Sequence, residues 1–150
     1  MNEQQRRGGE DRPQVPTVDV HKFITEGPSR AMTEQTEAFG TYLAKKAQLK
    51  TSQIRNIFGT VRKIEMIWQP NAEPQEIAKA QRQLIMLKPK MKYQAEREFR
   101  RDSRSTGVRD LAGVLSPAID EIGNDRQKFL NFVDLFEAIL AYHTAAGGKN

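Results

Sequence analysis

The chain has 150 residues, enough for one domain, and carries 24 Lys and Arg against 19 Asp and Glu, which gives a net charge of +5. Because it contains no cysteine, a disulfide framework, a thiolate metal site and a cysteine nucleophile are all excluded. It has no apolar run long enough to span a membrane and no signal-peptide pattern at its start, so we expect a soluble, cytoplasmic protein that has no membrane partner.

Residues 1–29 are predicted to form a flexible tail, since they mix Gln, Glu, Arg, Gly and Pro without a sustained apolar period. One short apolar cluster in this segment is a candidate to rest on the domain or on a partner, and it consists of Val18, Val20, Phe23 and Ile24. We expect residues 30–150 to form a single helical-bundle domain.

Apolar residues at three- and four-residue steps predict a helix over residues 33–48 and a second one from a cap at Thr51 or Ser52 through Ile67. After a linker with two prolines, a third helix starts at Pro74. Pro89 lacks an amide hydrogen and its ring disturbs the preceding turn, so we expect a kink or a fresh helix start there.

The segment 108–122 also has helical spacing, but it is predicted to be broken by Pro117. The last helix, about 126–145, places Phe129, Phe132 and Phe136 on one wide apolar stripe and forms the aromatic centre of the core. Because no segment alternates with the period of a strand, the predicted fold class is all-α, a compact bundle of five to six helices.

Positive charge is concentrated in two segments. Residues 45–63 hold six basic side chains and no acid, and residues 79–109 hold ten basic and three acidic side chains, a net charge of +7. Residues 110–150 carry three basic and six acidic side chains instead. An ordinary solvated surface mixes both signs, so this segregation favours a polyanion such as nucleic acid as the ligand.

Within the first basic segment, Arg55 and Arg62 are two helical turns apart and share a face that is not the apolar stripe. A rise of about 10 Å between them lets two guanidinium groups reach successive backbone phosphates. In the second segment Tyr93 and Phe99 are candidates either to stack on a base or to pack against the bundle.

The sequence lacks the residues that catalysis requires. His21 lies in the predicted tail and His143 on the core stripe, and neither has a second histidine at metal-ligand spacing. No glycine-rich phosphate loop, dinucleotide motif or serine-hydrolase motif occurs. We therefore expect no enzyme activity, no catalytic residue, no metal site and no cofactor.

Three blocks of the sequence resemble the small subunit of type III-A CRISPR (Csm) effector complexes. They read LKTSQIRNIF at 49–58 followed by VRKIE at 61–65, LKPKMKYQAER at 87–97, and FVDLFEAILAYH at 132–143. They occur in the same order and spacing as in that family, and the resemblance covers about residues 33–145.

The resemblance implies a non-catalytic subunit of an antiviral effector that lines the inside of a ribonucleoprotein filament. Such a subunit binds the backbone of target RNA, or of the guide–target duplex, without sequence preference. The implied partners are guide RNA, target RNA, the large subunit, the repeated backbone subunits and further copies of the chain itself. The residues that it implies to face RNA are Lys50, Arg55, Arg62, Lys63, Lys88, Lys90, Tyr93 and Arg97.

Two other functions stay open at this point. A small helical regulator that binds one DNA sequence needs two packed helices joined by a short turn, and the proline-containing linker at 69–74 is atypical of that motif. The third possibility is a purely structural assembly subunit whose basic face contacts protein.

Overall fold

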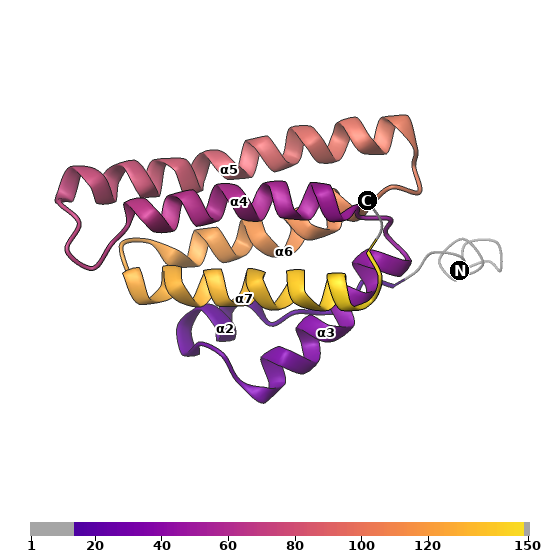
Figure 1. The fold of residues 1–150 in the computed structure, drawn as a ribbon, viewed down its shortest axis with the longest axis horizontal. Helices are drawn as coiled ribbons and strands as arrows, with labels where there is room; N and C mark the ends of the chain where they lie inside the picture. The colour runs from indigo at the N-terminus through magenta and orange to yellow at the C-terminus, as the bar shows by residue number, and fades with distance from the viewer. Residues whose placement is uncertain (1–13, 149–150) are drawn as a thin grey trace, which may run out of the picture.

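The computed structural model describes residues 14–148, which form six α-helices and no strand (Figure 1). The predicted all-α class is confirmed for these residues. The helices are α2 (Val20–Glu26), α3 (Arg30–Lys45), α4 (Thr51–Ile67), α5 (Pro74–Arg101), α6 (Gly107–Ile122) and α7 (Arg126–Ala145).

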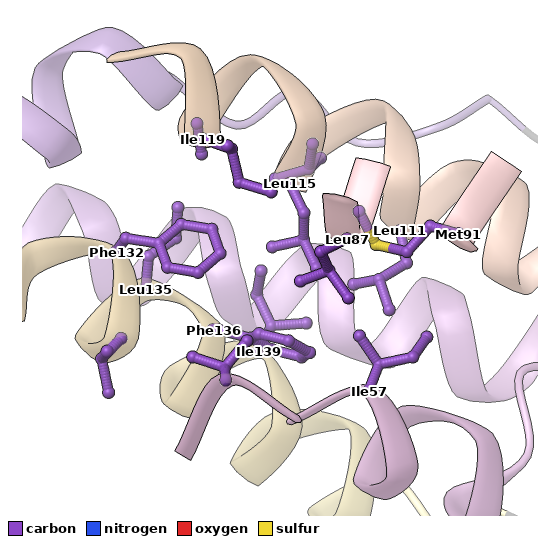
Figure 2. Packing of buried hydrophobic residues seen from close by; sticks show 14 of the residues in the cluster. Ile57, Leu87, Met91, Leu111, Leu115, Ile119, Phe132, Leu135, Phe136 and Ile139 are labelled. Carbon is purple, nitrogen blue, oxygen red and sulfur yellow. The ribbon is translucent and has the colours of Figure 1, made fainter. Parts of the chain in front are cut away.

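Helix α7 supplies the centre of the core and packs against α2, α3, α4 and α6 (Figure 1). As predicted, its Phe129, Phe132 and Phe136 are completely buried. Burying one such side chain contributes about 1.5–3 kcal/mol to stability. Figure 2 shows the α7 side chains meeting apolar residues of three other helices, namely Ile57 of α4, Leu87 and Met91 of α5, and Leu111, Leu115 and Ile119 of α6.

Helix α7 has the bounds predicted from the sequence, and α4 ends at Ile67 as predicted but begins at Thr51 with Lys50 as its N-cap, before the predicted cap at Thr51 or Ser52. Helix α3 is shifted towards the N-terminus. The Ser29 hydroxyl accepts a hydrogen bond from the Met32 amide at 3.1 Å, so α3 begins at Arg30 instead of residue 33. It ends at Lys45, before the predicted residue 48. The chain then turns at Gln48, whose φ of 58° is in the left-handed region.

The predicted flexible tail does not extend to residue 29. Residues 1–13 lie outside the described part of the chain, but residues 20–26 form α2, which packs against α6 and α7. Phe23 and Ile24 are completely buried, and the Asn131 side chain donates a hydrogen bond to the Ile24 carbonyl at 2.8 Å. The apolar cluster thus rests on the domain, because burying it offsets the entropy lost when this segment is ordered.

The fresh helix start that was one of the two outcomes expected at Pro89 does not occur, and neither does the break at Pro117, since α5 and α6 each continue through their proline. Both prolines are exposed, so water can hydrate the carbonyl groups that lose their helical partner. On the buried side Leu84, Leu87 and Met91 continue one apolar stripe past Pro89, and their packing holds the helix together.

The connection between α4 and α5 is anchored on α7, which fixes the two helices side by side (Figure 1). Trp68 is 2% exposed and stacks on Phe129 with ring centroids 5.1 Å apart. Its carbonyl accepts a hydrogen bond from Arg126 Nε at 2.9 Å. Helix α5 therefore runs back along α4, and the two basic segments of the sequence become neighbours in space.

Candidate nucleic-acid interface

The outer surface of the α4–α5 pair carries exposed basic side chains from both helices. We call it the α4–α5 basic surface and define it as Arg55, Arg62 and Lys63 of α4 with Lys79, Arg82, Lys90, Arg97 and Arg100 of α5. The buried stripe of each helix faces the bundle, so these side chains point away from it. The same two helices also carry acids, among them Glu65 of α4, described below, and Glu76 of α5, which is exposed one turn before Lys79.

On α5 the exposed cations follow one straight stripe. Seven exposed residues recur at steps of three and four, in the order Lys79, Arg82, Met86, Lys90, Tyr93, Arg97 and Arg100. Residues at this spacing share a helix face, and the stripe extends over about 32 Å by the helical rise. Neither Met86 nor Tyr93 is covered, with 47% and 69% of their surfaces exposed. The stripe thus offers charge along its length and an aromatic ring in its middle.

Ion pairing distinguishes this stripe from the opposite side of α5. Among the described residues, none of the five stripe cations has an acidic partner. Towards α6, however, Lys88 Nζ lies 2.5 Å from Asp120, and Glu96 accepts contacts from Lys92 at 3.6 Å and Arg109 at 3.7 Å. The positive charge on the α6 side is thus compensated within the protein, while the stripe is left for another ligand.

The predicted pair Arg55 and Arg62 is exposed, as expected, and its two members have different surroundings. Arg55 has no acidic partner among residues 14–148. Arg62 Nη1 donates to Glu65 at 2.6 Å, and its guanidinium lies 5.9 Å from the centre of the Phe58 ring. An exposed i,i+3 pair contributes under about 1 kcal/mol. A phosphate group can therefore compete with Glu65 for Arg62.

Lys50 lies at one end of the basic surface, directly before α4. The preceding residue is fixed because buried His143 Nε2 lies 2.6 Å from the Leu49 carbonyl, which makes Nε2 the donor. On the other side, the Thr51 hydroxyl donates to the Gly148 carbonyl at 2.8 Å. His143 is thus a structural core residue that holds the start of α4 against the end of α7.

Acidic side chains are found on the other side of the bundle, where α3 and α7 lie in Figure 1. Exposed acids there are Glu34 and Glu37 of α3 with Asp134 and Glu137 of α7. Burial and the neighbouring Glu137 raise the pKa of Asp134. Since α3 and α7 also carry Arg30, Lys45, Arg126 and Lys128, these two helices together have no net charge, in contrast to the basic surface along α4 and α5.

The structure brings seven of the eight predicted RNA-facing residues to exposed positions on or beside the basic surface and separates Lys88 from them. The same surface also contains Lys79, Arg82 and Arg100, which belong to the second basic segment but are not among the residues predicted to face RNA. Their spacing from Lys90 and Arg97 is the signal that finds them. That signal is visible only if the helix is read as continuous through Pro89.

Groups typical of catalysis do not converge among residues 14–148. No set of three or more His, Asp or Glu side chains in this part of the chain is placed to hold a metal ion. His21 pairs with Glu121 at 2.9 Å and His143 with a backbone carbonyl. None of the described helices is long and apolar enough to cross a membrane.

A sequence model of the family described as Csm2 Type III-A matches residues 26–149. No curated protein and no solved structure matches the chain. The family match covers the helices that build the basic surface, all of α3 to α7, and extends beyond the blocks on which the resemblance was based. The chain belongs to the Csm2 Type III-A family, the small subunits of the Csm effector complexes of type III-A CRISPR systems.

Proposed function

We propose that this chain is a non-catalytic, RNA-binding subunit that contacts RNA phosphates through the α4–α5 basic surface. Within a cytoplasmic type III-A effector it lines the inner side of the filament, beside the large subunit, the repeated backbone subunits and further copies of itself. Its RNA ligands are the target RNA and the guide–target duplex. Base pairing supplies the sequence specificity, and the protein contributes backbone contacts.

The observation that carries this proposal is the α5 stripe of cations without acidic partners. Five side chains of one sign along about 32 Å repel one another unless a polyanion compensates them. Flexible Lys and Arg side chains on one continuous helix supply charge at intervals, which suits a phosphate backbone. Direct readout of a sequence requires side chains held in one orientation that form bidentate hydrogen bonds with base edges, and flexible side chains do not provide these.

The proposal predicts a strong effect of salt on RNA binding. If about five phosphates are contacted, the logarithm of the affinity for a single strand falls by about 3.5 per logarithmic unit of salt. Raising the salt concentration fourfold should therefore weaken binding by about 100-fold. Short labelled RNAs of unrelated sequence should bind with equal affinity in fluorescence anisotropy.

The decisive variant is Arg55→Glu with Arg62→Glu, which reverses two exposed charges without touching the core. A matched control is Lys22→Glu with Arg30→Glu, since these exposed residues of α2 and α3 lie away from the basic surface and the net charge changes equally. Both proteins should keep the helical circular dichroism spectrum of the parent. We expect about a tenfold or larger loss of RNA affinity at moderate salt for the first variant and little change for the control.

Equal losses in both variants would show that only net charge matters and would refute the proposed surface. Preference for one duplex DNA sequence would instead support the DNA-binding regulator. If the assembled complex protects target RNA equally well with Arg55→Glu and Arg62→Glu, the basic surface contacts protein and the chain is an assembly subunit.

A further inference from the structure

A cavity lies at the end of the bundle where α4 begins and α7 ends, not on the α4–α5 basic surface itself. Figure 1 shows these two helix ends close together. The volume of the cavity is about 590 Å³, within the range of about 300–1,000 Å³ that is typical of small-molecule sites. We call it the connector cavity, because the α3–α4 and α5–α6 connections form half of its lining. Its lining residues include Lys45, Gln48, Lys50 and Ser105.

The polar side chains of this cavity are not used by the fold. Lys45 and Lys50 form no ion pair with any described residue, and no acid is among the lining residues that the structure describes. The hydroxyl of Ser105 and the side-chain amide of Gln48 likewise have no hydrogen-bond partner within residues 14–148. Two cations, a hydroxyl and an amide around one cavity are the donors that a phosphate group requires.

The backbone of the cavity wall is strained at one residue. Gln48 has a φ of 58°, a conformation that costs a residue with a side chain about 1 kcal/mol or more. The Leu49 amide donates to the Leu43 carbonyl at 3.0 Å, and the Leu49 carbonyl is held by His143, so the turn is fixed from both sides. This turn connects Lys45 and Lys50, which both line the cavity.

The other half of the lining consists of Ala44, Leu49, Ala146 and Gly147, and since Leu49 is only 1% exposed and Gly147 has no side chain, the methyl groups of Ala44 and Ala146 form its apolar contact surface. A bare phosphate would leave this half of the cavity without a contact. A ribose or a base attached to the phosphate would fill it, because small-molecule sites combine an apolar wall with a few convergent polar groups.

We propose that the connector cavity binds one nucleoside monophosphate unit, with the phosphate between Lys45 and Lys50 and the ribose and base against Ala44, Leu49 and Ala146. The unit is either a free nucleotide or a single unpaired nucleotide of the RNA that follows the neighbouring basic surface. The second source rests on the proposed RNA-binding function, and the first does not.

The test is a titration of the ¹⁵N-labelled chain with adenosine 5′-monophosphate, followed by amide chemical shifts. We expect saturable shifts at Lys45, Gln48, Lys50 and Ser105, with little change on the outer face of α5. Inorganic phosphate is the comparison probe, and we expect it to bind at least about tenfold more weakly because it makes no apolar contact. Phosphate that gives the same shifts at the same concentration would overturn the nucleotide assignment.

Two variants test the two halves of the cavity. Ala146→Leu fills the apolar side without changing any charge, and Lys45→Ala with Lys50→Ala removes the cations. Each should weaken adenosine monophosphate binding by about tenfold or more, whereas Lys46→Ala, an exposed neighbour that does not line the cavity, should bind like the parent. Unchanged binding in both test variants would overturn the proposal.

A short single-stranded RNA distinguishes the two sources of the ligand and separates this proposal from the preceding one. If RNA competes with adenosine monophosphate for the Lys45 and Gln48 shifts, the cavity takes a nucleotide of the strand; without competition it takes a free nucleotide. RNA binding that depends on Arg55 and Arg62 while adenosine monophosphate causes no shift would refute the cavity site alone. If the cavity binds the nucleotide but RNA affinity does not depend on Arg55 and Arg62, only the proposed role of the basic surface is refuted.

Discussion

Replacing Pro89 with alanine tests the continuity of α5, on which the stripe of cations depends. The proline lies inside the helix, and its missing amide leaves the Ile85 carbonyl without a helical partner. A proline in a helix interior costs about 3 kcal/mol relative to alanine. Part of this gain is offset, because proline also restricts the unfolded chain by about 1 kcal/mol at most. Pro89→Ala should therefore raise the free energy of unfolding by about 2 kcal/mol.

For a chain of this length the same gain corresponds to a rise of about 4–8 °C in Tm. Urea unfolding followed by circular dichroism measures the gain in free energy of unfolding. The matched control is Pro74→Ala in the first turn of the same helix, where proline removes no hydrogen bond, and this variant should not be more stable than the parent. If Pro89→Ala stabilises no more than Pro74→Ala, α5 does not continue through residue 89 and the reasoning for one continuous stripe fails.

Three further predictions concern packing, ionisation and the stripe. Gly40→Ala should lower the free energy of unfolding, measured with urea, by about 1–3 kcal/mol, because the added Cβ would lie 2.9 Å from backbone atoms of α7. Gly59→Ala, whose added Cβ would have only open space around it, should raise the free energy of unfolding by up to about 1 kcal/mol. Burial, followed by the hydrogen bond to a carboxylate, raises the pKa of Tyr42 to about 12, so the folded state keeps its proton while the unfolded state loses it above about pH 10. Stability should therefore fall by about 2–3 kcal/mol between pH 10 and 12, a loss that Tyr42→Phe should not show in pH-dependent unfolding. Lys90→Glu with Arg97→Glu should weaken RNA binding and lower the slope of its salt dependence by about 1.4, and an unchanged slope would remove these two residues from the interface.

Local patterns in the sequence were sufficient for much of the fold. The apolar stripe of α4 and the aromatic stripe of α7 predicted both helices, with the bounds of α7 and the C-terminal end of α4 as observed, because a helix with one wide apolar face has only one way to bury it. The burial of His143 on the α7 stripe was also predicted correctly.

The prolines show where local rules failed. The cost of a proline in a helix is real, but packing of the buried stripe on both sides of Pro89 and Pro117 exceeds it. The sequence shows the cost at one position, while the compensating contacts come from α4, α6 and α7. If α5 were interrupted at Pro89, Lys79 and Arg82 would not share a helix face with Lys90, so the sequence prediction did not place these three residues on one surface.

The amino-acid sequence by itself determined the helices, the aromatic core and the two segments that carry the excess positive charge, because these depend on composition and on spacing along the chain. Only the tertiary structure decided which charges remain available. Lys88 and Lys90 are two residues apart, yet Asp120 of α6 pairs with Lys88 and no described acid reaches Lys90. The connector cavity likewise exists only in the folded chain, since residues 44–45, 48–50, 105 and 146–147 meet at one end of the bundle. Pairing and cavities depend on distances between segments remote in sequence, which the packing of the helices sets.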